Sequence, residues 1–184
     1  MTTRQSDWPR QWLMTDERLG ERLWEAIENL PERSGVVFRH YATPNADRET
    51  LAQEVAALCR TRGLTLGVAC DGELAASVDA DLVHNPLRIP ETLPFSKAVH
   101  SIEEAQAARK SAAALVFVSP VFPTRSHPGQ EPLGIELATV IAKATEVPAI
   151  ALGGMDVQKF ALLERDGFYG WAGIDAWLGD ALRT

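Results

Sequence analysis

The chain has few of the features that would tie it to a membrane, to nucleic acid or to an oxidising compartment. No apolar run in its 184 residues approaches the ~20 residues of a membrane-spanning helix, and residues 1–10 lack the apolar stretch of a secretory signal. A formal charge of −7 argues against nucleic acid or an anionic membrane as a general partner. Two cysteines, Cys59 and Cys70, are too few for a disulfide framework or a zinc site. We therefore predict a cytoplasmic protein with reduced thiols.

The chain does contain an alternation of short apolar, β-branched runs with stretches of helical period. Such alternation is typical of repeated βα units around a parallel sheet, and eight units can be counted. The length and the 46% hydrophobic content suit one domain over residues 1–184. We predict a compact TIM (β/α)8 barrel with strands over 12–15, 35–39, 64–69, 80–83, 96–99, 114–118, 147–152 and 167–172.

The predicted helices alternate with these strands, and the fourth helix is reduced. Pro86, Pro90 and Pro94 leave room for at most one helical turn between the fourth and fifth strands. Ser101 and Glu104 have the spacing of a capping box, which marks the start of the fifth helix. The other helices are expected over 16–29, 47–62, 134–145, 156–164 and 174–182, with a short one opening at Asp71.

A stiff loop over 119–127 follows the sixth predicted strand. Its prolines cannot continue a strand ladder, so the chain must turn away from the sheet there. The loop carries the hydroxyls of Thr124 and Ser126, the cation of Arg125 and the imidazole of His127. Hydroxyls and cations at a rigid strand end favour an anionic ligand, whereas a simple connecting loop is the alternative.

Gly153 and Gly154 form a second candidate site at the end of the seventh strand. Two glycines let backbone amides approach a ligand closely, and phosphate sites of such barrels commonly use the loops after strands seven and eight. The alternative is a tight turn in which Asp156 caps the next helix.

The four histidines of the chain all fall at the carboxyl ends of predicted strands, or in the loops that follow. They are His40, His84, His100 and His127. This face carries the chemistry of barrel enzymes, and imidazole titrates near neutrality. For each histidine a structural or surface role is the alternative. A metal site made by His40, His84 and His100 is disfavoured, because no two of them have a short ligand spacing.

Several segments in order along the chain resemble thiamine phosphate synthases and the related thiazole tautomerases. They are W-L-M-T-D in the first strand, A-V-H-S-I-E-E-A over 98–105, S-P-V-F-P-T-R-S-H-P over 119–128, P-L-G over 132–134 and V-P-A-I-A-L-G-G-M over 147–155. The resemblance implies a TIM barrel. In the synthases this barrel joins an aminopyrimidine methyl pyrophosphate to a thiazole phosphate with Mg²⁺ and releases pyrophosphate.

The resemblance also implies roles for individual residues. Arg39 matches an arginine of the family's second strand, and Asp71 matches an acid that binds Mg²⁺. The phosphate groups would be bound by Thr124, Ser126, Gly153 and Gly154. Small phosphate and pyrophosphate compounds are therefore the expected partners.

Other positions depart from the family pattern. Val37 and Tyr41 stand where the family has glutamine and lysine, and the second magnesium-binding acid is absent. Asp175 stands near the place of a serine that would help to bind phosphate. These changes together remove most of the groups that would bind pyrophosphate and its metal.

Three functions remain open at this level. The first is the synthase reaction, impaired by the departures. The second is proton transfer on thiazole phosphate or another small phosphate; Pro120 replaces the histidine of the tautomerases, so His100 or His127 would have to act. The third is binding of a phosphate or pyrimidine without turnover. A homo-oligomer is compatible with all three.

Overall fold

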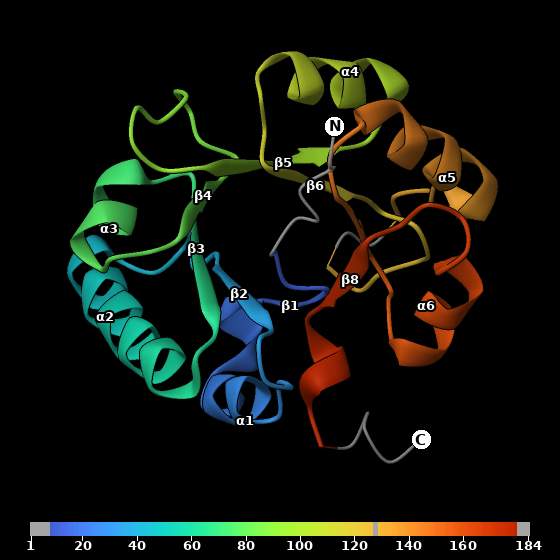
Figure 1. Cartoon of the computed structure of the whole chain (residues 1–184). Helices are drawn as coiled ribbons and strands as arrows, with labels where there is room; N and C mark the ends of the chain where they lie inside the picture. Colours follow the sequence, from blue (N-terminus) through green and yellow to red (C-terminus); the bar gives the residue numbers. More distant parts are fainter. Residues whose placement is uncertain (1–7, 127–128, 180–184) are drawn as a thin grey trace.

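A closed barrel of eight parallel strands forms the centre of the computed structural model, which describes residues 8–126 and 129–179 (Figure 1). Each strand pairs with the next in chain order, and β8 returns to β1. The predicted barrel is thereby confirmed. The strands are β1 (Gln11–Met14), β2 (Gly35–Phe38), β3 (Thr65–Ala69), β4 (Leu82–His84), β5 (Phe95–Val99), β6 (Leu115–Val118), β7 (Ala149–Leu152) and β8 (Gly170–Gly173).

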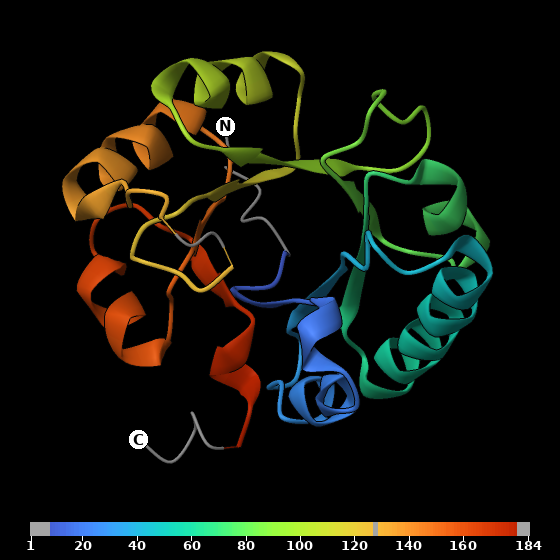
Figure 2. The ribbon, with the colours of Figure 1, turned by 180° about the vertical axis from the view of Figure 1, so that it is seen from behind.

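The helices form an incomplete ring outside the strands, as Figures 1 and 2 show from the two ends of the barrel. Across the part of the chain that the structure describes, no helix is both long and apolar enough to cross a membrane. The helices are η1 (Glu17–Leu19), α1 (Arg22–Glu28), α2 (Asn45–Arg62), α3 (Gly72–Ser77), α4 (Ile102–Lys110), α5 (Gly134–Thr145), α6 (Val157–Leu163) and η2 (Asp175–Trp177).

A loop replaces the helix between β4 and β5, as the prolines predicted. Two side chains attach this loop to the neighbouring strand. Lys97 Nζ donates to the carbonyl of Pro86 over 3.2 Å, and Asn85 Oδ1 accepts from the Ala98 amide over 2.8 Å. The β4–β5 corner is therefore closed by side-chain hydrogen bonds where the other corners use helices.

Short polar side chains start three of the α-helices, because each accepts a hydrogen bond from an otherwise unpaired amide. Asp71 caps α3, Ser101 caps α4 and Asp156 caps α6. The Ser101–Glu104 capping spacing is thus confirmed, with the Glu104 carboxylate accepting from the His100 amide over 2.6 Å.

The predicted closing helix over 174–182 is wrong within the described residues. Only the 3-10 turn of η2 forms, and Leu178 is extended with ψ 141. Tertiary contacts hold this segment in place of a longer helix. The Trp177 carbonyl accepts from Asn29 Nδ2 over 2.9 Å, and the Trp177 indole stacks on Trp171 with ring centroids 4.6 Å apart. Residues 180–182 of this prediction lie outside the described part.

Large side chains fill the barrel interior beneath the site. Trp12 and Phe117 meet edge to face with centroids 5.6 Å apart, and both are fully buried. Gly35 makes room for the indole, since a Cβ atom there would lie 2.2 Å from the Trp12 ring. A packed interior leaves ligand binding to the loops at the end of the barrel.

Candidate functional site

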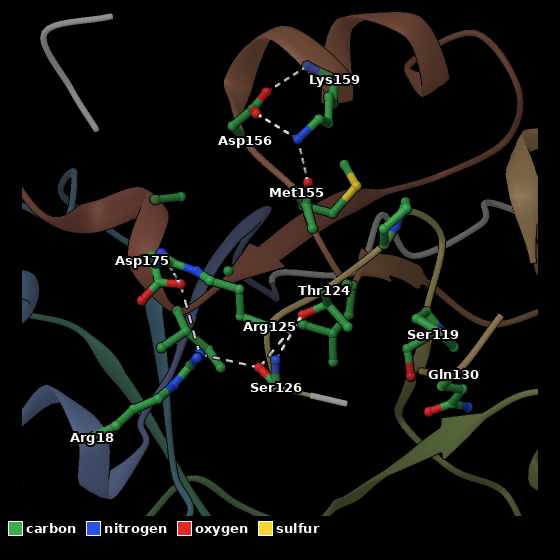
Figure 3. Close-up of a pocket in the computed structure, with 18 of the residues that line it drawn as sticks. Arg18, Ser119, Thr124, Arg125, Ser126, Gln130, Met155, Asp156, Lys159 and Asp175 are labelled. Atoms are coloured by element: carbon green, nitrogen blue, oxygen red, sulfur yellow. Dashed lines mark hydrogen bonds and ion pairs between the residues drawn. The ribbon is translucent and has the colours of Figure 1, made fainter. Parts of the chain in front are cut away.

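A cavity of about 420 Å³ lies at the carboxyl ends of the strands. Its walls come from the segments that follow β1, β2, β5, β6, β7 and β8, and Figure 3 shows most of its lining side chains. The structure brings six of the sequence-predicted site residues to this one cavity: Arg39, His100, Thr124, Ser126, Gly153 and Gly154.

The glycine pair is required by the close approach of the loop after β6. Both glycines have left-handed backbones, with φ of +96° at Gly153 and +61° at Gly154. The Phe122 amide donates to the Gly153 carbonyl over 3.1 Å. A Cβ atom at Gly154 would lie 2.3 Å from the Pro123 carbonyl oxygen, and one at Gly153 would lie 2.7 Å from Pro120 Cα. The two predicted candidate sites are therefore one packed unit.

The hydroxyls of the loop after β6 are held by each other and by a neighbouring cation. Thr124 Oγ1 accepts from the Ser126 amide over 3.3 Å and lies 3.5 Å from Ser126 Oγ. Arg18 Nη2 donates to Ser126 Oγ over 3.1 Å. Arg18 was not among the sequence candidates, because in the chain it belongs to the turn after β1, 108 positions from Ser126.

Arg39 places a second guanidinium in the cavity wall. Its Nε donates to the Thr15 carbonyl over 3.0 Å, and its Nη2 lies 3.6 Å from Asp16 Oδ2. Burial lowers the pKa of Arg39 from its usual value of 12.5, but a guanidinium stays charged at neutral pH. The cavity therefore holds a fixed, largely desolvated cation.

Lys159 adds a further cation, which was also not among the sequence candidates. Its Nζ donates to the Gly154 carbonyl over 2.6 Å and lies 3.0 Å from Asp156 Oδ2. Burial alone would raise the pKa of Asp156, but the hydrogen bonds from the backbone and side chain of Lys159 outweigh burial and lower this pKa. Asp156 is therefore ionised and pairs with Lys159 beside the glycine turn.

His100 lines the cavity with one ring nitrogen already engaged. Its Nδ1 lies 2.6 Å from the Ser119 carbonyl oxygen. A carbonyl only accepts hydrogen bonds, so Nδ1 carries the proton and the neutral ring keeps a free lone pair on Nε2. This arrangement makes His100 a proton acceptor. His127, the other predicted catalytic histidine, lies outside the described residues.

Comparison with known proteins identifies the family. The family described as thiamine monophosphate synthase matches residues 11–177, which is nearly the whole barrel. The chain belongs to the thiamine monophosphate synthase family. It is 30% identical over 182 residues to a protein of Aquifex aeolicus (strain VF5) provisionally named thiamine-phosphate synthase 2, with 92% of this chain and 98% of that protein covered.

A second relative and a solved structure are also similar to this thiamine monophosphate synthase family protein. The thiamine-phosphate synthase of Roseiflexus sp. (strain RS-1) is 30% identical over 184 residues, covering 91% of this chain and 78% of the relative. The structure of a thiamine phosphate pyrophosphorylase from Pyrococcus furiosus matches with a TM-score of 0.81 at 23% identity, covering 97% of this chain and 92% of that one. At this identity the structural match establishes the fold.

Asp71, the predicted metal ligand of this synthase-family protein, does not line the cavity. It lies at a separate surface hollow beside Arg48. Its Oδ2 accepts from Arg48 Nη1 over 2.8 Å, and its Oδ1 caps α3 by accepting from the Leu74 amide over 2.9 Å. Arg48 is held in turn by the His40 carbonyl. Both carboxylate oxygens are thus engaged within the protein.

His40 and His84 take the structural role that the sequence left open. Both are buried, and each places Nδ1 beside a hydroxyl: His40 at 3.0 Å from Thr15 Oγ1, and His84 at 2.9 Å from Ser96 Oγ. Burial lowers the pKa of both rings, that of His84 to about 3. Neither lines the cavity.

We predict that the buried His84 makes this synthase-family protein sensitive to mild acid. Its pKa is about 3 when folded and near 6.5 when exposed, so its neutral form stabilises the fold fully above pH 6.5, and this contribution is lost as pH falls from 6.5 toward 3. Between about pH 7.5 and about pH 5 the free energy of unfolding should fall by about 2 kcal/mol from this group. Urea denaturation at each pH measures it.

The matched variant is His84→Asn, which can keep a hydrogen bond to Ser96 but does not titrate. Its stability should fall by about 2 kcal/mol less than that of the wild type over the same interval. Equal pH slopes in the two proteins would contradict the prediction.

Proposed function

We propose that the protein is a thiamine phosphate synthase-type transferase, which couples an aminopyrimidine methyl pyrophosphate with a thiazole phosphate in thiamine biosynthesis. In this reaction the thiazole nitrogen forms a C–N bond to the methylene carbon, and pyrophosphate leaves with the electrons of the broken C–O bond. The observation that supports the proposal is the convergence of Arg39, Thr124, Ser126 and the glycine pair on one cavity of about 420 Å³.

The cavity offers what a departing anion requires. Arg39 is a buried guanidinium that is fixed by backbone and carboxylate contacts, so it need not reorganise when negative charge develops. In a partly desolvated wall its attraction acts more strongly than in water. We assign Arg39 to the pyrophosphate, and the hydroxyls of Thr124 and Ser126 to the thiazole phosphate.

Mg²⁺ is the metal that the family resemblance implies, and the residues present do not fit it. Asp71 is the single matched acid, and an arginine and a helix amide occupy both its oxygens. Among residues 8–126 and 129–179, no three His, Cys, Asp or Glu side chains are arranged to hold a metal ion. Mg²⁺ commonly binds through one or two carboxylates together with substrate phosphates, so an engaged carboxylate is a poor ligand. We derive no catalytic step through the metal.

A thermal-shift titration tests this misfit. We predict that Mg²⁺ raises the melting temperature of the wild type no more than that of Asp71→Asn, because a ligand stabilises a protein only when it binds the folded state. Asparagine keeps the cap of α3, so the variant is matched in fold. A shift that is clearly larger in the wild type than in the variant would contradict the prediction.

The direct test of the proposed function uses both substrates. Purified protein is incubated with the aminopyrimidine methyl pyrophosphate and the thiazole phosphate, with Mg²⁺ in one arm and a chelator in the other, and thiamine phosphate is followed by mass spectrometry. Product above the protein-free reaction is expected in both arms, because no catalytic step is assigned to the metal. No product in either arm would reject the synthase assignment.

A second candidate is proton transfer on the thiazole phosphate, and the geometry of His100 favours it. The Ser119 carbonyl orients the ring, and Nε2 is left as the basic atom in a cavity with phosphate-binding groups. If neither reaction occurs but thiazole phosphate still raises the melting temperature, the protein binds its ligand without turnover.

Three broader expectations belong to the same proposal. They are one domain over 1–184, a cytoplasmic location and a homo-oligomer. Limited proteolysis, cell fractionation and sedimentation velocity test them in turn.

A further inference from the structure

Charged side chains from three separate barrel loops meet at one point of the cavity wall. They are Arg18 after β1, Arg125 after β6 and Asp175 after β8, and Ser126 lies beside Arg18 (Figure 3). Asp175 Oδ2 lies 2.8 Å from Arg125 Nη2 and 3.7 Å from Arg18 Nη2. A single carboxylate oxygen is therefore shared by two guanidinium groups.

The same atom of Arg18 also contacts the hydroxyl of the loop. Arg18 Nη2 donates to Ser126 Oγ over 3.1 Å while its Nε lies 3.2 Å from Asp16 Oδ1, which fixes the direction of the guanidinium. A phosphate oxygen is an acceptor of the same kind as a carboxylate oxygen, and arginine forks match both groups. The position of Asp175 Oδ2 is therefore one that a ligand's phosphate oxygen could take.

A ligand's phosphate can displace Asp175 from the two arginines, because these side chains are partly exposed. The side chains of Arg18 and Asp175 are 35% and 34% exposed, and that of Arg125 is 79% exposed. Ion pairs at such exposure contribute little to stability, so a competing anion need not overcome a strong bond. Removing the charge of Asp175 also leaves its backbone contact unchanged, because the main-chain carbonyl of Asp175, and not its carboxylate, accepts from the Leu178 amide.

We propose that Arg18, Arg125 and Ser126 form the phosphate subsite of the cavity, and that Asp175 occupies its two arginines in the free protein as an internal substitute for the ligand's phosphate. This inference rests on the proposed binding of thiazole phosphate, and it adds Arg18 and Asp175, which lie outside both the loop over 119–127 and the glycine pair. Asp175 holds the arginines in position before the ligand arrives, but its negative charge opposes the incoming phosphate.

The proposal predicts that substitutions at neighbouring residues change the affinity for thiazole phosphate in opposite directions. Asp175→Asn, which removes the charge and keeps the size, should bind thiazole phosphate about fivefold more tightly. Arg18→Ala should bind it about tenfold more weakly. Arg125→Ala should lose only about threefold, because water screens its more exposed guanidinium. The charge-matched control is Glu164→Gln, whose carboxylate pairs with Arg10 outside the cavity and whose affinity should equal that of the wild type.

Isothermal titration calorimetry at low ionic strength measures these affinities with thiazole phosphate, its dephosphorylated alcohol and inorganic phosphate. The alcohol should bind equally to the wild type and Asp175→Asn, since the effect acts on the phosphate group alone. If the wild type binds thiazole phosphate but Asp175→Asn binds it equally or more weakly, the inference is overturned while the proposed ligand stands. If inorganic phosphate follows the expected order and thiazole phosphate does not bind, the subsite stands and the proposed function fails. Binding of neither phosphate overturns both.

Discussion

Gly154→Ala is expected to destabilise the protein by about 3 kcal/mol and to abolish binding of thiazole phosphate. The backbone of Gly154 is left-handed, with φ of +61°, and a Cβ atom would lie 2.3 Å from the Pro123 carbonyl oxygen. That oxygen is rigid backbone, so the loop after β6 must move away from the turn. Thr124 and Ser126 move with it, because they lie in the same loop just after Pro123. Urea denaturation and calorimetry measure the two effects.

Gly72→Ala provides the matched control. Gly72 is the first residue of α3, its φ is not in the left-handed range, and no heavy atom lies within 4 Å of the added Cβ. Alanine there should leave ligand binding unchanged and raise the free energy of unfolding by at most about 1 kcal/mol. A Gly154→Ala protein that unfolds within about 1 kcal/mol of the wild type would contradict the close approach of loop and turn.

The second large effect is expected at His100 if the protein transfers protons on the thiazole phosphate. His100→Gln should lower the rate of that transfer by about 10²- to 10⁴-fold, because it removes the basic Nε2 of a histidine that lines the cavity. Affinity for thiazole phosphate should change by less than about threefold, since His100 is not one of the groups assigned to the phosphate. Nuclear magnetic resonance in deuterium oxide follows the exchange, and calorimetry follows the affinity.

The matched comparison is His127→Gln, which removes the other candidate histidine. Rapid exchange in His100→Gln together with its loss in His127→Gln would transfer the role to His127. Unchanged exchange in both variants would show that neither histidine transfers the proton. The assay with both substrates would then still test the synthase activity.

The candidate site was only partly readable from the sequence. The proline-rich loop and the glycine pair were found because each has a local signature of residue types. Arg18 and Lys159 were missed, because an arginine in a turn and a lysine in a helix carry no signature until folding places them at the cavity. Lys159 acts through the Gly154 carbonyl five positions earlier, and Arg18 through Ser126 108 positions later.

Asp71 shows what a residue's position in the sequence leaves open about its role. Its place at the end of β3 and the start of α3 was read correctly, and it caps α3. What the sequence could not show is that Arg48, on α2, turns back over the same carboxylate. A carboxylate's capacity to bind a metal depends on its neighbours, and those neighbours are set by helix packing.

The sequence by itself determined the barrel, the missing helix between β4 and β5, and the family. Strand and helix periods, prolines and glycines act over a few residues, so their structural meaning survives without knowledge of distant contacts. Only the tertiary structure decided which charges share an oxygen, which histidines are buried, and that the short 3-10 turn of η2 forms after β8. Those outcomes depend on distances between segments far apart in the chain, and hydrogen bonding, burial and ion pairing all act through distance.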